Sequence, residues 1–303
     1  MPLWLVLTLS AAFMQNIRSS VQKHLKGRVG TSGATLVRFL FGWPFALFYL
    51  FVIVRNLDEP LPSPGWTFLG WTVLGSFSQI GAQALLIFLF ALRNFAAGSA
   101  YARVEPVAAA MLAPALLGEA IGAGAWIGIA VSVVGVLLVS SAGSLAPGDL
   151  LRQLGSKAAR IGLFCALLFG LASVSYRGAA LSLGAPETGL DGMARGAMVN
   201  SCAIILQTIL MAVWVTWREP EQWRAIGRAW RPSLLVGFVG ATASLGWFSA
   251  FALQDAATVK AVAQVEIVFA ILTSLVVFRE RVTRTEMAGA GFVASGVILL
   301  LAV

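Results

Sequence analysis

Charged side chains inside otherwise apolar segments are the residues of this sequence best placed to do chemistry. Each costs roughly 2.5–3.5 kcal/mol at the centre of a membrane helix, so each is expected to face a cavity or a partner. Five of them are cations and two are carboxylates. A cavity with that excess favours an anionic group on its ligand, such as the carboxylate of an amino acid or organic acid, over a lipophilic cation. The seven residues are Arg18, Arg38, Arg103, Glu105, Arg177, Lys260 and Glu266.

Several of these charges can be accommodated without a cavity. Arg18, Arg177 and Lys260 lie close enough to the ends of their segments for the charged head to reach the lipid headgroups. The carboxyls of Glu105 and Glu266 have three possible roles: a structural clamp between helices, gating or proton coupling, and direct contact with a substrate. The sequence leaves these alternatives open.

The surroundings of the two glutamates are consistent with gating or coupling. Tyr101 and Glu105 are four residues apart and share a helical face, whereas Arg103 lies two residues from each and points towards another helix. Gln264 and Glu266 occupy the matching positions near the end of the chain. The gating or coupling set expected from the sequence is Arg103, Glu105, Lys260 and Glu266.

Neutral polar side chains form a second group of candidates, because they can hydrogen-bond a zwitterion without fixing its net charge. Ser76, Gln79 and Gln83 follow an i, i+3, i+7 spacing, which places them on one stripe of a helix. Such side chains are equally suited to hold helices together. The expected lining of a substrate cavity is Gln15, Asn16, Ser76, Gln79, Gln83, Tyr101, Tyr176, Thr242, Ser244, Trp247 and Gln264.

Prolines within the apolar segments mark positions where a helix can bend. Each removes a backbone donor and can kink the helix. We regard Pro44 and Pro106 as hinge candidates, with an inert packing kink as the alternative.

The elements that carry these residues form a repeat. A repeated hydrophobic unit with an odd number of helices predicts an inverted-repeat transporter, with its substrate site near the membrane midplane between the repeats. Each member of the pattern recurs 161 residues later: Val104-Glu105, Glu119, Gly128 and Gly135-Val136 become Val265-Glu266, Glu280, Gly289 and Gly296-Val297.

Composition assigns these elements to a membrane. Of the 303 residues, 59% are hydrophobic and 11% are charged, against roughly 25% charged in soluble domains. A spanning helix needs about 20 apolar residues. The segments that qualify are 3–22, 34–54, 66–90, 97–117, 121–141, 158–183, 194–216, 232–253, 257–278 and 284–302. We expect an all-α membrane protein of ten transmembrane helices in two inverted five-helix repeats, 1–141 and 158–303, with a linker at 142–157.

The net charge of +8 follows the loops rather than forming a nucleic-acid-binding patch. Fourteen Lys and Arg residues fall in loops after odd-numbered spans, against Arg55 and Arg195 after even-numbered spans. Cytoplasmic loops carry the Lys/Arg excess, so both termini are expected on the periplasmic side. The first span has no preceding positive residue and no clear cleavage site, so we expect it to be retained rather than removed as a signal peptide.

The sequence contains no recognisable catalytic or metal-binding motif. It lacks the H-E-x-x-H, G-x-S-x-G and phosphate-loop patterns, and Cys165 and Cys202 stand alone. We therefore expect no enzymatic activity, no cofactor and no metal. The glycines that crowd spans 5 and 10 indicate close packing between these helices or, alternatively, the seam of a homo-oligomer.

The repeated glutamate in the fourth span of each half, the glutamate at that helix's end and the glycines of the fifth span resemble the EamA family of the drug/metabolite transporter superfamily. The first half has the fuller pattern, with Pro106 and Gly118, where the second has Ile267 and Arg279. The resemblance covers essentially the whole chain. It implies a ten-helix basket with a central cavity lined by spans 1, 3, 4, 6, 8 and 9, and spans 5 and 10 behind.

The expected function is export of amino acids or related small metabolites across the bacterial inner membrane by alternating access. The alternatives are a drug or quaternary-cation extruder and, in a different class, a non-transporting membrane receptor or scaffold. The expected partners are the small-molecule substrate and the lipid bilayer.

Overall fold

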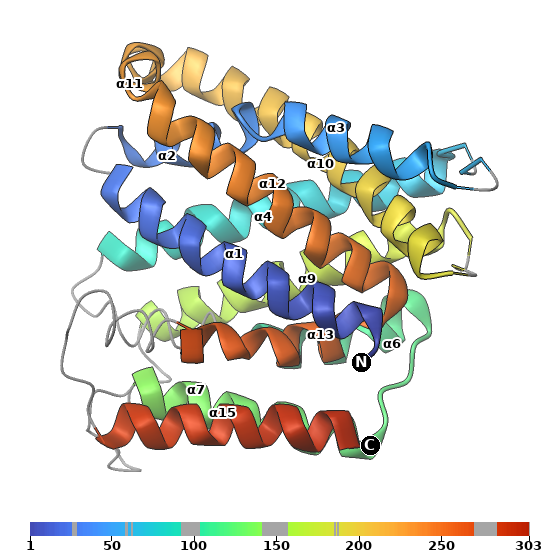
Figure 1. The fold of residues 1–303 in the computed structure, drawn as a ribbon. Coiled ribbons are helices and arrows are strands. Elements are labelled where there is room, and N and C mark those ends of the chain that lie inside the picture. Colours follow the sequence, from blue (N-terminus) through green and yellow to red (C-terminus); the bar gives the residue numbers. More distant parts are fainter. Residues whose placement is uncertain are drawn as a thin grey trace. The chain divides into compact units, whose positions relative to one another are not determined.

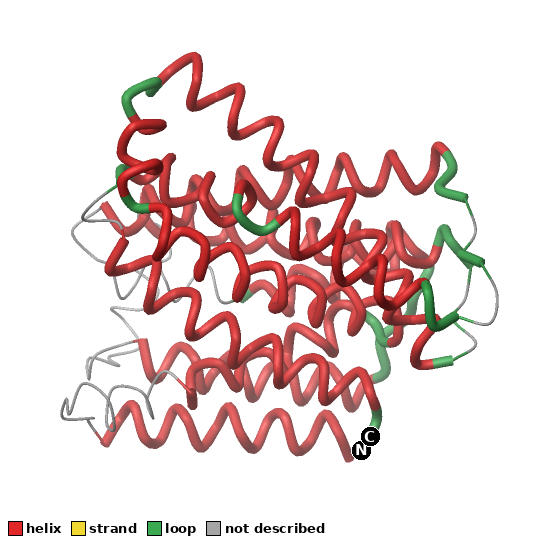
Figure 2. Tube along the Cα trace, turned by 45° about the horizontal axis from the view of Figure 1, so that its top comes forward, coloured by secondary structure: helices red, strands yellow, loops and turns green. Residues whose placement is uncertain are grey.

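The structure, a computed structural model, describes residues 1–25, 29–57, 60–61, 63–91, 104–140, 157–184, 186, 188–269 and 284–302. Within these ranges every regular element is a helix (Figure 1; Figure 2), so the expected all-helical class is confirmed there. The elements are α1 (Leu3–Leu25), α2 (Thr31–Leu40), α3 (Trp43–Val54), α4 (Trp66–Ala91), α6 (Glu105–Leu117), α7 (Ala123–Ser140), α9 (Lys157–Leu181), α10 (Gly189–Arg218), α11 (Gln222–Arg228), α12 (Trp230–Leu253), α13 (Ala256–Val262), the 3-10 helix η1 (Ala263–Val265) and α15 (Arg284–Ala302).

Several of these helices have the length and composition of membrane spans. In the described residues, four helical segments are long and apolar enough to cross a bilayer: Ser32–Val54, Arg160–Leu181, Gly189–Arg218 and Trp230–Leu253. Helices α4, α7, α12 and α15 begin and end within a few residues of the spans expected from hydropathy. Parts of the fourth and ninth expected spans lie outside the described residues, so the ten-span inverted repeat stays a prediction.

The second expected span is not one helix. Helices α2 and α3 are separated by a turn at Phe41–Gly42, and Pro44 occupies the first turn of α3, where its missing N–H breaks no helical hydrogen bond. A Cβ on Gly42 would lie 2.8 Å from Ile204 Cδ1 and 3.2 Å from Gly237 O. The turn is therefore held close to α10 and α12, and the predicted hinge at Pro44 is a break in the helix.

Each of the repeated glutamates stands at the start of a described helical stretch. In the span expected at 97–117, Val104 forms a turn and α6 begins at Glu105. In the span expected at 257–278, α13 gives way to η1, and helix resumes at Glu266. A 3-10 turn inside a helix often marks a hinge. Glu105 thus begins α6, and Glu266 stands where helix resumes after η1, which hydropathy does not reveal.

One residue used to infer topology lies elsewhere than expected. Arg195 is buried inside α10 rather than in a loop. Its Nε and Nη2 donate to Asp191 at 3.0 and 2.9 Å, and its Nη1 donates to the carbonyls of Leu183 and Gly184. Arg195 holds the connection between α9 and α10. It is therefore not one of the loop cations from which the topology can be inferred. Helix α11 was also not expected from the sequence.

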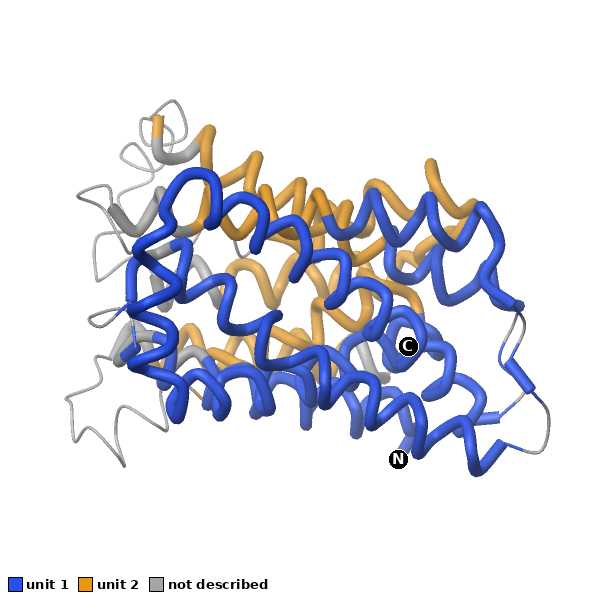
Figure 3. Tube along the Cα trace, turned by 90° about the horizontal axis from the view of Figure 1, so that it is seen from above, with its two compact units in different colours: residues 1–76, 175–254 blue, residues 77–174, 255–303 orange. Residues whose placement is uncertain are grey.

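The helices group into two compact units (Figure 3). Unit 1 comprises residues 1–76 and 175–254, and unit 2 comprises residues 77–174 and 255–303. Each unit draws on both halves expected from the sequence repeat, and the five-helix halves stay a prediction. The divisions fall inside α4 and α9, so each of these helices contributes one part to each unit.

Unit 1 is built on long helix contacts. Helix α12 packs along α1 and α10, and α10 also packs against α2 and α3. Gly246 of α12 allows α1 to approach closely, because a Cβ there would lie 2.9 Å from the Cβ of Ala11. The interior of this unit receives the polar side chains of six helices.

Glycines join α7 and α15 in unit 2, where the two helices lie side by side (Figure 1). A Cβ on Gly135 would lie 2.6 Å from Gly289 O, and one on Gly296 would collide with Ser132. These glycines are therefore used for packing within the chain, the first of the two alternatives. A homo-oligomer seam elsewhere on these helices stays a prediction.

Candidate functional site

A group of buried polar and aromatic side chains converges in unit 1. We call it the arginine cluster. Each member has 8% or less of its surface exposed, and together they come from α1, α2, α9, α10 and α12. The members are Arg18, Arg38, Tyr176, Gln207, Ser244 and Trp247.

The two arginines meet over a glycine of α12. A Cβ on Gly240 would lie 3.3 Å from Arg38 Cγ and 3.5 Å from Arg18 Cδ, so this helix surface accommodates both side chains. Arg38 stands in the last turn of the short helix α2, just before the break at Gly42. Its Nη2 donates to Ser244 Oγ at 3.4 Å, a long and therefore weak hydrogen bond.

The arginine cluster concentrates positive charge. Within unit 1, the groups that interact electrostatically with Arg38 are Arg18, which repels it, and the Tyr176 hydroxyl. Buried charges of like sign raise the free energy of a site, and an anion placed between them lowers it. The two guanidinium groups are therefore close enough to repel each other.

Tyr176 is fixed by three helices. Its ring lies against Gly75 of α4, where a Cβ would come within 2.8 Å of Tyr176 Cε1. The ring centroid lies 4.3 Å from that of Phe248, and Gln207 Nε2 donates to the hydroxyl at 2.9 Å. The sequence predicted Tyr176 as a cavity residue, and in the structure its ring is buried against α4 and α12.

Trp247 and Gln15 were both expected to line a cavity, and they contact each other. Trp247 Nε1 donates to Gln15 Oε1 at 3.2 Å, which links α12 to α1. Ser244 is one turn earlier on α12 and contacts Arg38. Three predicted cavity residues are thus brought together at the arginine cluster.

A second charged group lies in unit 2. We call it the carboxylate cluster, formed by Glu105, Lys260 and Ser173. Lys260 Nζ and Ser173 Oγ each lie 2.9 Å from Glu105 Oε1. The side chains of Lys260 and Glu105 are 17% and 16% exposed, so the ion pair is largely but not fully buried.

The short helices α6 and α13 and the long helix α9 position the carboxylate cluster. Glu105 is the first residue of α6, followed by Pro106 in the first turn, so the predicted hinge at Pro106 stands at a helix start. Lys260 is in the last turn of α13, whose start is capped by Asp255 accepting from Thr258 N at 2.8 Å. Ser173 comes from α9, which approaches α6 closely at Gly170.

The contacts of three cations bear on whether their charged heads reach the lipid headgroups. Lys260 pairs with Glu105, and Arg177 Nη1 donates to Phe251 O at 2.7 Å. Arg18 is buried in the arginine cluster. Their charged groups are engaged inside the protein rather than extended from the ends of their helices.

The remaining predicted residues are distributed over the fold. Ser76 is buried in the part of α4 that belongs to unit 1, whereas Gln79 and Gln83 are half-buried in the part that belongs to unit 2. Asn16 is half-buried in α1, and Gln264 is buried in η1. Tyr101 and Arg103 lie outside the described residues, and Glu266 is half-buried at the helix restart.

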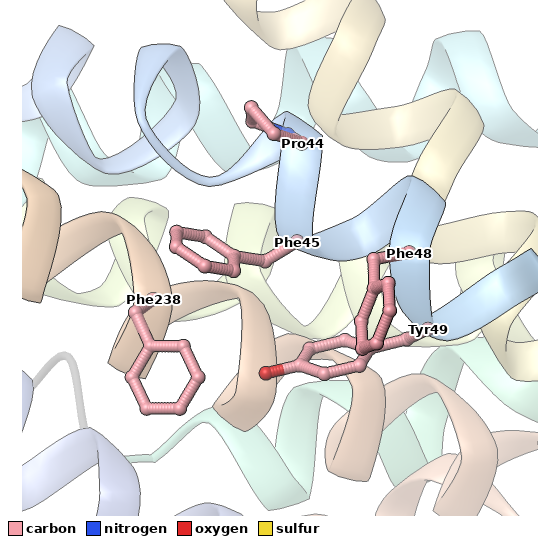
Figure 4. Close-up of a pocket in the computed structure, with 5 residues that line it drawn as sticks. All are labelled: Pro44, Phe45, Phe48, Tyr49 and Phe238. Carbon is pink, nitrogen blue, oxygen red and sulfur yellow. The ribbon is translucent and has the colours of Figure 1, made fainter. Parts of the chain in front are cut away.

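Thr242 lies at a different place from the arginine cluster. Its Oγ1 is 2.7 Å from the Tyr49 hydroxyl, at the contact of α12 with α3. Next to it is a pocket of about 430 Å³ lined by Pro44, Phe45, Phe48, Tyr49 and Phe238 (Figure 4). Because this lining carries no charge, the pocket suits apolar groups such as lipid chains.

Two members of the clusters and a glycine beside the arginines were not expected. Gln207, Gly240 and Ser173 are single polar or small residues in apolar helices, without a spacing pattern that singles them out. Arg18 and Arg38 were recognised as buried charges but not as cavity residues. Their adjacency depends on the packing of α1 and α2 against α12.

Comparisons with known proteins agree with this fold. A family model described as "EamA-like transporter family" matches residues 2–141 and 193–302. A solved structure, described only as a crystal structure of a protein, is similar over 99% of this chain and 97% of its own, with a TM-score of 0.73 and 16% sequence identity. At that identity the likeness shows the fold alone. No curated protein matches the sequence.

Proposed function

Because this chain belongs to the EamA-like transporter family, within the drug/metabolite transporter superfamily, we propose that it exports amino acids or related small metabolites across the bacterial inner membrane. Transport would proceed by alternating access, in which two repeats exchange conformations about a site near the midplane. The family resemblance inferred from the sequence is thus the premise of this proposal.

The observation that carries the proposal is the ion pair between Glu105 and Lys260. It connects the fourth span of one expected repeat to the ninth span, its counterpart in the other repeat. In these spans Glu105 begins α6, and helix resumes at Glu266 after η1. An ion pair between these two spans would hold α6 against α13 in one state and release it in another.

The excess of cations among the buried charges supports the substrate class. A drug or quaternary-cation extruder would need apolar or anionic groups around its ligand, which two adjacent arginines disfavour. A receptor or scaffold has no need of polar groups repeated at matching depth. Transport of small anionic or zwitterionic metabolites accounts for both features.

Flux measurements test this function directly. Purified protein in liposomes should accumulate members of a panel of radiolabelled amino acids and organic acids. Glu105→Gln and Glu266→Gln should reduce transport more than substrate affinity, because they shift the balance between states. Glu221→Gln, an exposed glutamate at the start of α11, is the control. Normal transport by both variants would show that the carboxyls are structural, and a parallel loss of binding would show that they contact substrate.

Topology provides a separate test. With both termini on the periplasmic side, a reporter enzyme that works only in the cytoplasm should be silent when fused after Val303. Strong reporter activity would overturn this orientation without affecting the transport proposal.

A further inference from the structure

We propose that the chain segment joining α10 to α12 binds the phosphate group of an anionic phospholipid at the membrane surface. Four arginines of this segment have exposed side chains, and we call them the basic corner. They belong to unit 1 and come from the end of α10, from α11 and from the start of α12. The inference goes beyond the proposed function, because lipid binding here requires no transport. The members of the basic corner are Arg218, Arg224, Arg228 and Arg231.

Two helices of membrane-spanning length place the basic corner at one boundary of the bilayer. The apolar span Gly189–Arg218 ends where the segment begins, and the span Trp230–Leu253 follows directly after α11. The two long helices pack against each other, and α11 lies at the end that they share (Figure 1). A chain that leaves the bilayer with one span and re-enters it with the next turns at a single membrane surface. The basic corner therefore lies at the level of the lipid headgroups.

Tryptophan rings hold two of the arginines at that level. Arg218 Cζ lies 4.6 Å from the ring centroid of Trp217 and 5.6 Å from that of Trp214. Arg231 Cζ lies 5.4 Å from the ring centroid of Trp230. All three rings are exposed, as is typical of tryptophans in the headgroup region. Because the face of an indole attracts a cation, both guanidinium groups are held in place before a lipid binds.

Helix α11 presents the other two arginines away from the protein. Arg224 and Arg228 are four residues apart and therefore share one face of the helix, and both side chains are exposed. Ile226, in contrast, is buried, and α11 contacts α2, α10 and α12. The helix thus packs on the protein through its apolar side and leaves its cations available to a headgroup.

The charge of the segment complements an anionic headgroup better than a zwitterionic one. Against its four arginines, the segment has two acids, Glu219 and Glu221. Glu219 Oε1 accepts a hydrogen bond of 2.7 Å from the Ser32 hydroxyl, which directs this carboxylate towards the start of α2. Each arginine near a membrane surface favours anionic lipids, and its planar fork of donors matches the oxygens of a phosphate. We therefore expect phosphatidylglycerol to bind more tightly than phosphatidylcholine.

Native mass spectrometry of the full-length protein, released from detergent micelles, tests this specificity. The probes are phosphatidylglycerol and phosphatidylcholine with identical acyl chains, added separately and in competition. Phosphatidylglycerol should bind at the lower lipid concentration, and a higher concentration of ammonium acetate should reduce its advantage, because salt screens exposed charges. Glycerol 3-phosphate at the same concentration as the lipid should not displace it, because this soluble phosphate has no acyl chains.

Substitutions of exposed side chains, which should leave folding intact, locate the binding. Arg218→Gln/Arg231→Gln removes the two arginines that lie over tryptophan and should weaken phosphatidylglycerol binding about tenfold or more. Arg218→Lys/Arg231→Lys should retain most of the preference for the anionic lipid, since the charge remains.

Arg55→Gln is the matched control. Arg55 is also exposed and its Cζ lies 5.2 Å from the ring centroid of Phe51. It follows the end of the span Ser32–Val54, whereas Ser32, at the other end of that span, contacts Glu219 of the segment. Arg55→Gln should therefore bind phosphatidylglycerol as the parent protein does.

Four results would overturn the proposal. They are equal binding of the two phospholipids, unchanged phosphatidylglycerol binding by the double glutamine variant, an equal loss of binding in Arg55→Gln, and displacement of the lipid by glycerol 3-phosphate. The last of these would assign the basic corner to a soluble phosphate compound. Failure of the proposed function would leave all four measurements unaffected, because none of them involves flux.

Discussion

The arginine cluster of unit 1 and the carboxylate cluster of unit 2 both bury charge, but they balance it differently. In the carboxylate cluster, Lys260 and Ser173 each lie 2.9 Å from the same oxygen of Glu105. In the arginine cluster, the charged neighbour that unit 1 provides for Arg38 is Arg18. The carboxylate cluster holds a matched pair of opposite charges, whereas the arginine cluster brings together a mismatched pair of like charges. A matched pair suits a gate, which is the role we propose for Glu105 and Lys260.

The largest effect should come from breaking the matched pair. Lys260→Met leaves the Glu105 carboxylate buried without its cation and should lower the free energy of unfolding by about 3 kcal/mol. Denaturant titration in detergent micelles measures this, with Lys157→Met at the exposed start of α9 as the control. The double variant Glu105→Gln/Lys260→Met should recover most of the loss. Equal instability of the single and double variants would contradict a role for the pair.

A smaller effect of opposite sign is expected from the mismatched pair. Without added anion, Arg38→Gln relieves repulsion by Arg18 and should leave the free energy of unfolding unchanged or raise it by about 1 kcal/mol. The same titration measures this change, with Arg55→Gln as the matched variant. A loss as large as that of Lys260→Met would show that the charge of Arg38 is balanced inside the protein, and the contrast between the clusters would disappear.

The smallest effect concerns the neutral member of the carboxylate cluster. Ser173→Ala removes one hydrogen bond to Glu105 and should cost about 1 kcal/mol. Ser182→Ala, which removes the hydrogen bond from an exposed serine to the carbonyl of Ala179, should cost less. Combined with Lys260→Met, the Ser173→Ala cost should not add, because both act on one carboxylate. Strict additivity would show that Ser173 acts independently of the ion pair.

The sequence predicted the spans better than it predicted their interruptions. Hydropathy locates α4 and α12 well because it averages over some twenty residues. The same averaging hides the turn at Phe41–Gly42 and the 3-10 turn before Glu266. Pro44 indicated the first break, whereas η1 contains no proline or glycine from which the second could be predicted.

The two clusters were likewise predicted only in part: the sequence identified several of their residues but not the contacts between them. Repetition identified Glu105 and Glu266, and burial of a charge identified Arg38 and Lys260 as candidates. Neither principle identifies partners: the contact between Glu105 and Lys260 joins residues 155 positions apart by number. Partners depend on which helices pack together, and a single sequence does not encode that in its spacing.

Helix α9 carries one residue of each cluster. Ser173 of the carboxylate cluster and Tyr176 of the arginine cluster are three residues apart on this continuous helix, on either side of the division between the units. By thermodynamic reciprocity, if a substrate held at Tyr176 strengthens or weakens the Ser173–Glu105 bond, then cutting that bond changes substrate affinity by the same factor. In that case, one turn of α9 would couple substrate binding to the ion-paired carboxylate of Glu105.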